Sequence, residues 1–134
     1  MPNNPIVSSQ PKILLSTADF GRLEALASAS LDKLLAAAVL LLNEIDRAEV
    51  RPKSELPDDV VAMGSHVRFR DEASGAVRRV QIVYPQEADI AAGRISVLTL
   101  IGAALIGVRV GQSIDCPTVD GQSRTLTVLE VEGN

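Results

Sequence analysis

Aromatic residues and positive charge are scarce in this 134-residue chain. Its three aromatic side chains, Phe20, Phe69 and Tyr84, cannot provide the stacking platform that single-stranded nucleic acids require. Basic residues number 13 against 17 acidic ones, so the chain also lacks the broad positive field that supplies most non-specific affinity for nucleic acid. We therefore expect no direct binding to RNA or DNA.

Cysteine and histidine are equally scarce, with one residue of each. Cys116 alone cannot form an intrachain disulfide or a thiolate metal cluster, which is compatible with a reducing cytoplasm. His66 lies in an alternating segment without a second histidine or a cysteine to complete a metal site, so we interpret it as a surface strand residue. We expect no metal and no cofactor.

Signals for export, membrane insertion and common enzyme chemistry are missing too. The first residues lack the basic and apolar regions of a secretory signal, and the apolar run from Leu34 to Leu42 is far shorter than the ~20 residues that span a bilayer. No Gly-x-Ser-x-Gly elbow occurs, and the segment from Gly102 to Gly107 lacks the lysine and hydroxyl residue of a phosphate loop. These absences predict a cytoplasmic protein that is not an enzyme.

The residues that are present divide the chain into three parts. Residues 1–12 carry prolines and polar residues and predict a flexible N-terminus. Residues 13–51 show helical periodicity and predict an antiparallel helical hairpin, a short coiled-coil arm. Residues 52–134 alternate as β-strands do and predict a small antiparallel sheet. The predicted fold class is α+β.

The boundaries of the two helices follow from capping and proline. The first helix should begin at Ser16 or Thr17, whose hydroxyl can accept a hydrogen bond from a free backbone N–H, and the chain should turn near residues 28–31. The second helix should run from about Asp32 to about Val50, because Arg51-Pro52 forbids continuation.

The second helix has an apolar stripe too wide for one partner helix to cover. Leu35 and Val39 widen the stripe, and Leu40 lies among the polar positions. Because monomers rarely leave large apolar patches exposed, these three residues predict self-association through the arm. The competing outcome is that the hairpin folds back on the sheet and hides the same residues within one chain.

The C-terminal part is organised around residues 86–107. Strands are predicted at residues 60–63, 66–70, 77–84, 111–114 and 124–131, the last with Leu126, Val128 and Glu130 on one face. Between the third and fourth of these, an acidic turn and a short β-like run lead into a compact apolar helix. Gly107 occupies the usual position of a left-handed helix end. Such a helix would plug a curved sheet.

The residues of this stretch also resemble a known family. Glu87-Ala88-Asp89-Ile90, Gly93-Arg94-Ile95-Ser96-Val97, Ala104-Leu105-Ile106-Gly107 and Gly111 resemble the C-terminal domain of the bacterial GreA/GreB transcript-cleavage factors. Together with Val83-Tyr84-Pro85, the short N-terminal part looks more like the Rnk-like branch, named for a regulator of nucleoside diphosphate kinase. The resemblance implies an FKBP-like C-terminal domain, which is a sheet wrapped on a short helix.

The resemblance also implies a partner and a binding surface. Relatives of this kind bind RNA polymerase near its secondary channel through an edge that corresponds here to Glu87, Asp89 and Leu98–Gly102, comprising Leu98, Thr99, Leu100, Ile101 and Gly102. The family tends to place Ser/Ala-Pro before the short helix, where this chain has Thr99-Leu100. Arg94 is expected to pair with Asp89 and hold the turn.

Transcript cleavage in the family relies on two acidic residues at the tip of a long arm, which help to hold a magnesium ion. Here the turn carries Asp32 followed by Lys33, and a helix of about 18 residues extends only ~27 Å. We interpret Asp32 as a helix-start residue. The resemblance therefore favours a polymerase-binding regulator that competes with Gre factors without stimulating cleavage.

Two other functions stay open at this point. The chain could be a true cleavage factor for which Asp32 suffices, or an FKBP-like prolyl isomerase. The second is disfavoured because three scattered aromatic residues cannot build an aromatic-lined pocket.

Overall fold

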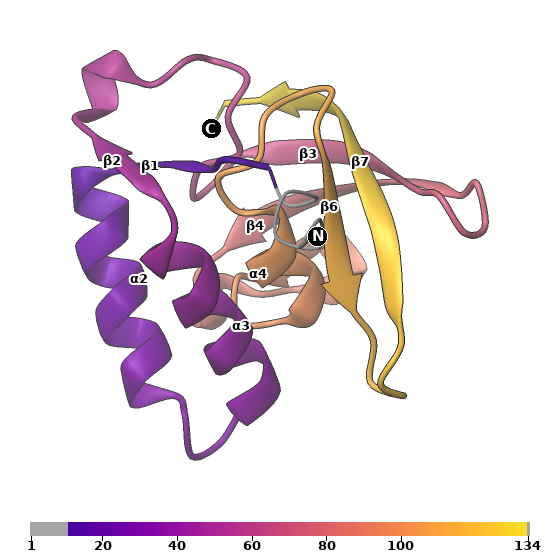
Figure 1. The fold of residues 1–134 in the computed structure, drawn as a ribbon, viewed down its shortest axis with the longest axis horizontal. Coiled ribbons are helices and arrows are strands. Elements are labelled where there is room, and N and C mark those ends of the chain that lie inside the picture. The colour runs from indigo at the N-terminus through magenta and orange to yellow at the C-terminus, as the bar shows by residue number, and fades with distance from the viewer. Residues whose placement is uncertain (1–10, 134) are drawn as a thin grey trace, which may run out of the picture.

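The computed structural model describes residues 11–133 as a helical N-terminal part packed beside a curled C-terminal sheet, with one short helix between them (Figure 1). The elements in chain order are β1 Leu14–Ser16, α2 Thr17–Ala29, α3 Leu35–Asp46, β2 Glu49–Arg51, η1 Lys53–Glu55, β3 His66–Asp71, β4 Val77–Val83, η2 Pro85–Glu87, η3 Ile90–Ala92, β5 Arg94–Ser96, α4 Leu100–Leu105, β6 Ser113–Pro117 and β7 Ser123–Glu132. Most of the flexible N-terminus predicted for residues 1–12 lies outside the described residues.

The predicted start of the first helix is confirmed. Ser16 is its N-cap, and the hydroxyl oxygen accepts a hydrogen bond from the backbone N–H of Asp19 at 3.0 Å. The second helix is shorter than predicted. It begins at Leu35 and ends at Asp46, so its 12 residues extend about 18 Å instead of ~27 Å.

The residues beyond Asp46 form a strand that sequence reasoning assigned to the helix. β2 pairs in parallel with β1, a strand that was also not predicted, and Leu14 N–H donates to the carbonyl of Gly107 at 3.0 Å. Two short strands therefore tie both ends of the helix pair together and fasten it to the C-terminal part. The proline at position 52 ends this strand and not the helix.

The wide apolar stripe of α3 is explained by two partners. α3 packs against α2 on one side and against α4 on the other, and its inward residues Ala38, Leu41 and Ile45 belong to the same hydrophobic core as the sheet. This matches part of the competing expectation that the helices fold back on the sheet domain. Leu40 is half-buried against that core, so its predicted place on an exposed surface is wrong.

The sheet has the strand order β5-β4-β3-β7-β6, in which only β4 and β5 pair in parallel. Its strands curl around α4, and α4 is buried over most of its surface (Figure 1). The strand predicted at residues 60–63 is an extended segment with one isolated bridge, from Val60 to Arg109. Among residues 11–133, the helices lack the length and continuous apolar surface that a membrane-spanning segment needs.

β7 contains an irregularity that corrects one predicted facing. Arg68 pairs with Glu130 while the next residue of β3, Phe69, pairs with Val128, so Leu129 is an extra residue in β7. Such a bulge shifts the alternation by one. Leu126 and Val128 face the core as predicted, but Glu130 turns outward beside Arg68 at 3.4 Å.

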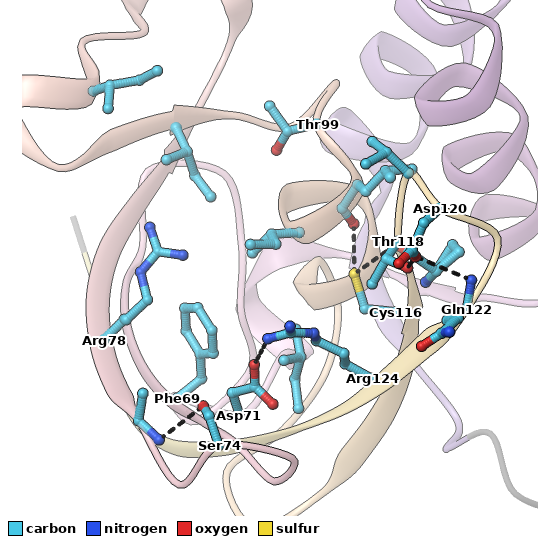
Figure 2. Close-up of a pocket in the computed structure, with 18 residues that line it drawn as sticks. Phe69, Asp71, Ser74, Arg78, Thr99, Cys116, Thr118, Asp120, Gln122 and Arg124 are labelled. Atoms are coloured by element: carbon cyan, nitrogen blue, oxygen red, sulfur yellow. Dashed lines mark hydrogen bonds and ion pairs between the residues drawn. The ribbon is translucent and has the colours of Figure 1, made fainter.

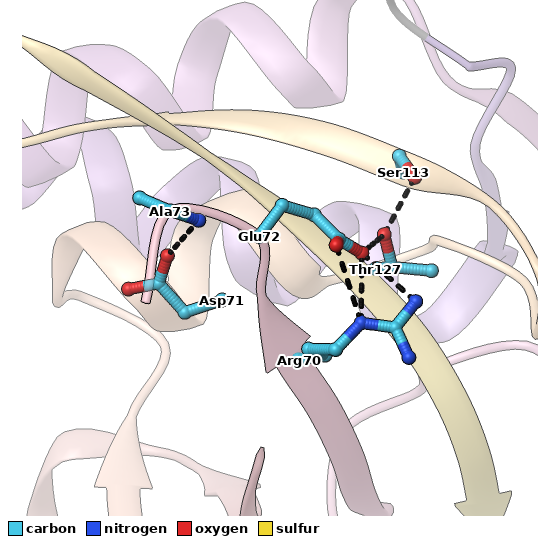
Figure 3. A network of polar contacts seen from close by, with 6 residues as sticks. All are labelled: Arg70, Asp71, Glu72, Ala73, Ser113 and Thr127. Atoms are coloured by element: carbon cyan, nitrogen blue, oxygen red, sulfur yellow. Dashed lines mark hydrogen bonds and ion pairs between the residues drawn. The ribbon is translucent and has the colours of Figure 1, made fainter. Parts of the chain in front are cut away.

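A polar network holds β3, β6 and β7 together near the turn after β3 (Figure 3). The Glu72 carboxylate accepts hydrogen bonds from Arg70 at 3.1 Å and from the Thr127 hydroxyl at 2.6 Å, and these lower the pKa of Glu72, Arg70 having the larger effect. The Thr127 hydroxyl in turn contacts the Ser113 hydroxyl at 2.7 Å. These bonds fix the outer face of the sheet opposite the concave side.

Gly107 closes α4 as the sequence predicted. Its φ of 82° lies in the left-handed region that favours glycine. A Cβ at this position would approach Ile13 Cβ at 2.9 Å and the Leu14 carbonyl oxygen at 3.1 Å. The glycine therefore also allows β1 to pass close to the end of α4.

Candidate partner-binding site

A pocket of about 820 Å³ opens on the concave side of the sheet, beside the start of α4 (Figure 2). Its apolar lining comes from four of the five strands and from the short helix: Phe69 on β3, Leu126 on β7, Cys116 on β6, Ile95 on β5, and Leu100 and Ile101 on α4. Residues far apart in sequence thus converge on one cavity, which sequence reasoning did not foresee.

Two exposed apolar residues line the pocket from opposite turns. Ile90, in η3, is 85% exposed, and Val119, in the turn between β6 and β7, is 97% exposed. Apolar side chains that the rest of the protein leaves exposed are available to contact a partner. Together with the apolar lining they make this the strongest candidate for an interaction surface.

The pocket also carries charge at its margins. Arg78 is the register partner of Phe69, and its guanidinium carbon lies 5.9 Å from the centre of that ring. Among residues 11–133 it forms no ion pair. Arg124, by contrast, donates to Asp71 and lowers the pKa of that carboxyl. Arg78 is therefore the available cation of the pocket.

Asp120 supplies negative charge on the other side of the opening, in the turn after β6 (Figure 2). The Thr118 hydroxyl donates to its carboxylate, which lowers the pKa of Asp120. No ion pair to Asp120 is formed within the described part of the chain. The pocket thus has an apolar interior and, besides the paired Arg124 and Asp71, one cation and one anion that form no ion pair within the described residues, Arg78 and Asp120.

The acidic turn that precedes β5 is built as predicted, but from two short turns. Asp89 caps η3 by accepting from Ala92 N–H at 3.3 Å, and its backbone exchanges two hydrogen bonds of 2.9 Å with Arg94. The Arg94 guanidinium lies 3.6 Å from the Asp89 carboxylate, so the predicted pairing is confirmed. Asp89 is occupied in holding the turn, while Glu87 is exposed beside it.

The predicted edge at residues 98–102 is partly inside the protein. Leu98 is only 5% exposed and Gly102 is buried, whereas Thr99, Leu100 and Ile101 line the pocket. Leu98 and Gly102 can therefore support the edge from within but cannot present side chains to a partner.

Thr99-Leu100 occupies the position at which the resemblance implies a Ser/Ala-Pro pair, and Thr99 is the N-cap of α4. Its hydroxyl oxygen accepts from Gly102 N–H at 3.0 Å and its O–H donates to the Ser96 carbonyl at 2.7 Å. The two bonds fix the start of α4, because they satisfy the Ser96 carbonyl before the helix and the Gly102 N–H within its first turn. The loop is thus held by hydrogen bonds instead of by a proline ring.

Cys116 contributes packing to the pocket as a buried thiol. Its thiol donates to the Leu100 carbonyl at 3.5 Å, and burial raises the pKa of the thiol to about 11. At neutral pH it is therefore protonated and a poor nucleophile. No group of three or more His, Cys, Asp or Glu side chains in residues 11–133 is arranged to hold a metal ion.

The two remaining predicted surfaces lie on the helix pair. Asp32 is exposed in the turn between α2 and α3, where it does not cap α3, because the N-cap is Leu34 and lacks a side-chain cap bond. The interpretation of Asp32 as a helix-start residue is therefore wrong. Leu35 is 62% exposed and Val39 is also exposed, as the prediction of an uncovered arm requires.

The sequence analysis did not single out Arg78, although the alternation of residues in this strand indicated its unusual position. Arg78 precedes Val80 and Ile82 at intervals of two, which places a charged residue on the apolar face of β4. In the structure this cation lies at the margin of the pocket. Val119 carried no comparable signal.

The family model described as "Transcription elongation factor, GreA/GreB, C-term" matches residues 56–133, and that described as "Rnk N-terminus" matches residues 11–50. The chain is 38% identical over 124 residues to the regulator of nucleoside diphosphate kinase of Escherichia coli (strain K12), which covers 92% of this chain and 91% of that protein. It is 41% identical over 91 residues to transcription elongation factor GreA of Azorhizobium caulinodans, 68% of this chain and 57% of that protein.

A solved structure agrees with these sequence matches. The prokaryotic transcription elongation factor GreA/GreB from Nitrosomonas europaea has a TM-score of 0.71 and 36% identity, over 90% of this chain and 99% of that one. The likeness includes the helical part as well as the curled sheet. The resemblance inferred from residues 83–111 is thereby confirmed.

Proposed function

Because this chain belongs to the GreA/GreB family of transcription elongation factors and carries an Rnk-type N-terminal part, we propose that it is an RNA polymerase-binding regulator of transcription. It docks near the secondary channel, competes with Gre factors and does not stimulate transcript cleavage. The observation that carries the proposal is a family C-terminal domain joined to helices of only 13 and 12 residues.

The docking surface is the edge of the concave pocket. Thr99, Leu100 and Ile101 offer side chains there, with Glu87 and Asp89 on the adjoining turn. Leu98 and Gly102 support this edge from the interior. An apolar interior with a polar margin is the usual anatomy of a binding surface that gains most of its affinity at its centre.

The helix pair supports the proposed absence of cleavage. A hard divalent cation requires several oxygen ligands, and the α2–α3 turn offers Asp32 next to Lys33 in place of a second acid. A helix of 12 residues also extends only about 18 Å, and one side of α3 is occupied by α4. Little of the arm is left to reach an active centre.

The alternative is a Gre-type elongation factor that stimulates cleavage in backtracked polymerase. Its support is the exposure of Asp32 in the turn between the helices. In that case polymerase would supply the other metal ligands.

A cleavage assay on backtracked polymerase distinguishes the two. We expect the protein alone to leave the transcript intact and to reduce, in proportion to its concentration, the cleavage that an added Gre factor stimulates. Cleavage by this protein that is lost in Asp32→Asn would support the alternative and contradict the proposal.

The proposal also includes the type of each of the two structural parts. We describe residues 13–51 as a helical hairpin and residues 52–134 as an FKBP-like domain, and the burial of α4 within the curled sheet supports the second description. The proposed regulator acts on polymerase in the cytoplasm and makes no direct contact with nucleic acid. Only one of the three aromatic residues, Phe69, lines the pocket, which does not favour a prolyl isomerase.

A further inference from the structure

The turn between α2 and α3 and the concave pocket have matching chemistry. The turn carries two exposed leucines, Leu34 and Leu35, preceded by the exposed charges of Asp32 and Lys33. None of these four residues forms an ion pair or side-chain hydrogen bond within residues 11–133. One end of the molecule therefore offers an apolar tip with one anion and one cation.

The pocket offers the complement of that tip. Its interior is apolar, and its available charges are a cation, Arg78, and an anion, Asp120, which lie on different sides of the opening (Figure 2). We propose that the concave pocket binds the α2–α3 turn of a second copy of this chain. Leu34 and Leu35 enter the pocket, Asp32 pairs with Arg78, and Lys33 pairs with Asp120.

This contact joins two different surfaces, so it is heterologous. Two copies form a closed dimer if each turn reaches the other's pocket, and longer species form if it does not. At every such contact the exposed residues of one turn and of one pocket are covered together. The contact therefore accounts for the exposed apolar side chains of both the turn and the pocket, which an arm-to-arm contact through Leu35 and Val39 does not.

Self-association of this kind covers the proposed docking surface and thereby regulates polymerase binding. This inference rests on the proposed function. Thr99, Leu100 and Ile101 line the pocket that the second copy fills. A copy bound to another copy then cannot present this edge to polymerase. Binding to polymerase should consequently fall at concentrations at which the protein self-associates.

Charge reversal on the full chain tests the contact. We expect sedimentation velocity over a concentration series to show association of the wild-type protein, with the dissociation constant raised about tenfold or more by Arg78→Asp or by Asp32→Arg, because each reversal opposes like charges. Combining both reversals should restore association. Arg79→Asp is the matched control, since Arg79 pairs with Glu132 and does not line the pocket. Circular dichroism verifies the fold of every variant.

Three results would overturn the contact: a monomer throughout the series, association unaffected by Arg78→Asp, or a double variant no better than the single ones. Loss of association in Val39→Glu but not in Arg78→Asp would show an arm-to-arm interface instead. Polymerase binding is measured separately with the non-associating Arg78→Asp and Asp32→Arg variants. Failure of both to bind polymerase, with the charge-reversal pattern intact, would contradict the proposed function alone.

Discussion

Gly102→Ala should lower the free energy of unfolding by about 2–3 kcal/mol, although alanine is the better helix former. A Cβ on Gly102 would lie 2.4 Å from the Ser96 carbonyl oxygen and 3.0 Å from Val97 Cα. Both neighbours are backbone atoms, and Val97 N–H is bonded to the Val83 carbonyl at 2.9 Å, so the loop cannot move aside freely. Urea unfolding followed by circular dichroism measures the change.

Gly21→Ala is the matched control because it makes the same substitution in a helix without the contact. Gly21 lies on the exposed side of α2, and a Cβ there meets no atom within 4 Å. We expect this variant to be more stable by about 0.5–1 kcal/mol, from helix propensity alone. Equal effects of the two substitutions would contradict the close packing of α4 against the loop before it.

Arg47→Met should cost about 3 kcal/mol because it leaves a buried carboxylate without its partner. Glu44 is buried within α3, and Arg47 reaches it with two hydrogen bonds, from Nη2 at 2.6 Å and from Nε at 3.0 Å. The third donor of the guanidinium, Nη1, bonds to the Pro11 carbonyl. The pair therefore joins the end of α3 to the chain that precedes β1.

The double variant Glu44→Met with Arg47→Met should recover most of that loss, since it removes the buried charge along with its partner. Arg68→Met provides a control, because Arg68 and Glu130 form an ion pair in which both side chains are about half exposed. Such a pair contributes about 1 kcal/mol or less. The role of the buried pair would be disproved if Arg47→Met behaved like Arg68→Met in thermal and urea unfolding.

The parts of this fold that depend on local chemistry could be predicted from the sequence. The Ser16 cap, the left-handed Gly107 and the pairing of Asp89 with Arg94 each involve residues close in the chain. Their physical causes, a free backbone donor, a positive φ and a short ion pair, need no knowledge of distant segments.

The parts that depend on distant contacts could not be predicted. β1 and β2 are three residues each and exist because they pair with one another across the helix pair. The extra residue Leu129, which turns Glu130 outward, is visible only in the register of β7 against β3. The pocket likewise forms only where five strands converge. The sequence therefore could not predict that its lining residues lie together.

The most direct test of the proposed function is a binding titration of the labelled full chain against bacterial core RNA polymerase. We predict saturable binding that a Gre factor displaces. Ile90→Glu should weaken it about tenfold, because Ile90 is an exposed residue that lines the pocket. Val50→Glu, on an exposed residue that does not line it, should leave binding unchanged. Absence of saturable binding, or binding that an excess of Gre factor does not displace, would contradict the proposed function.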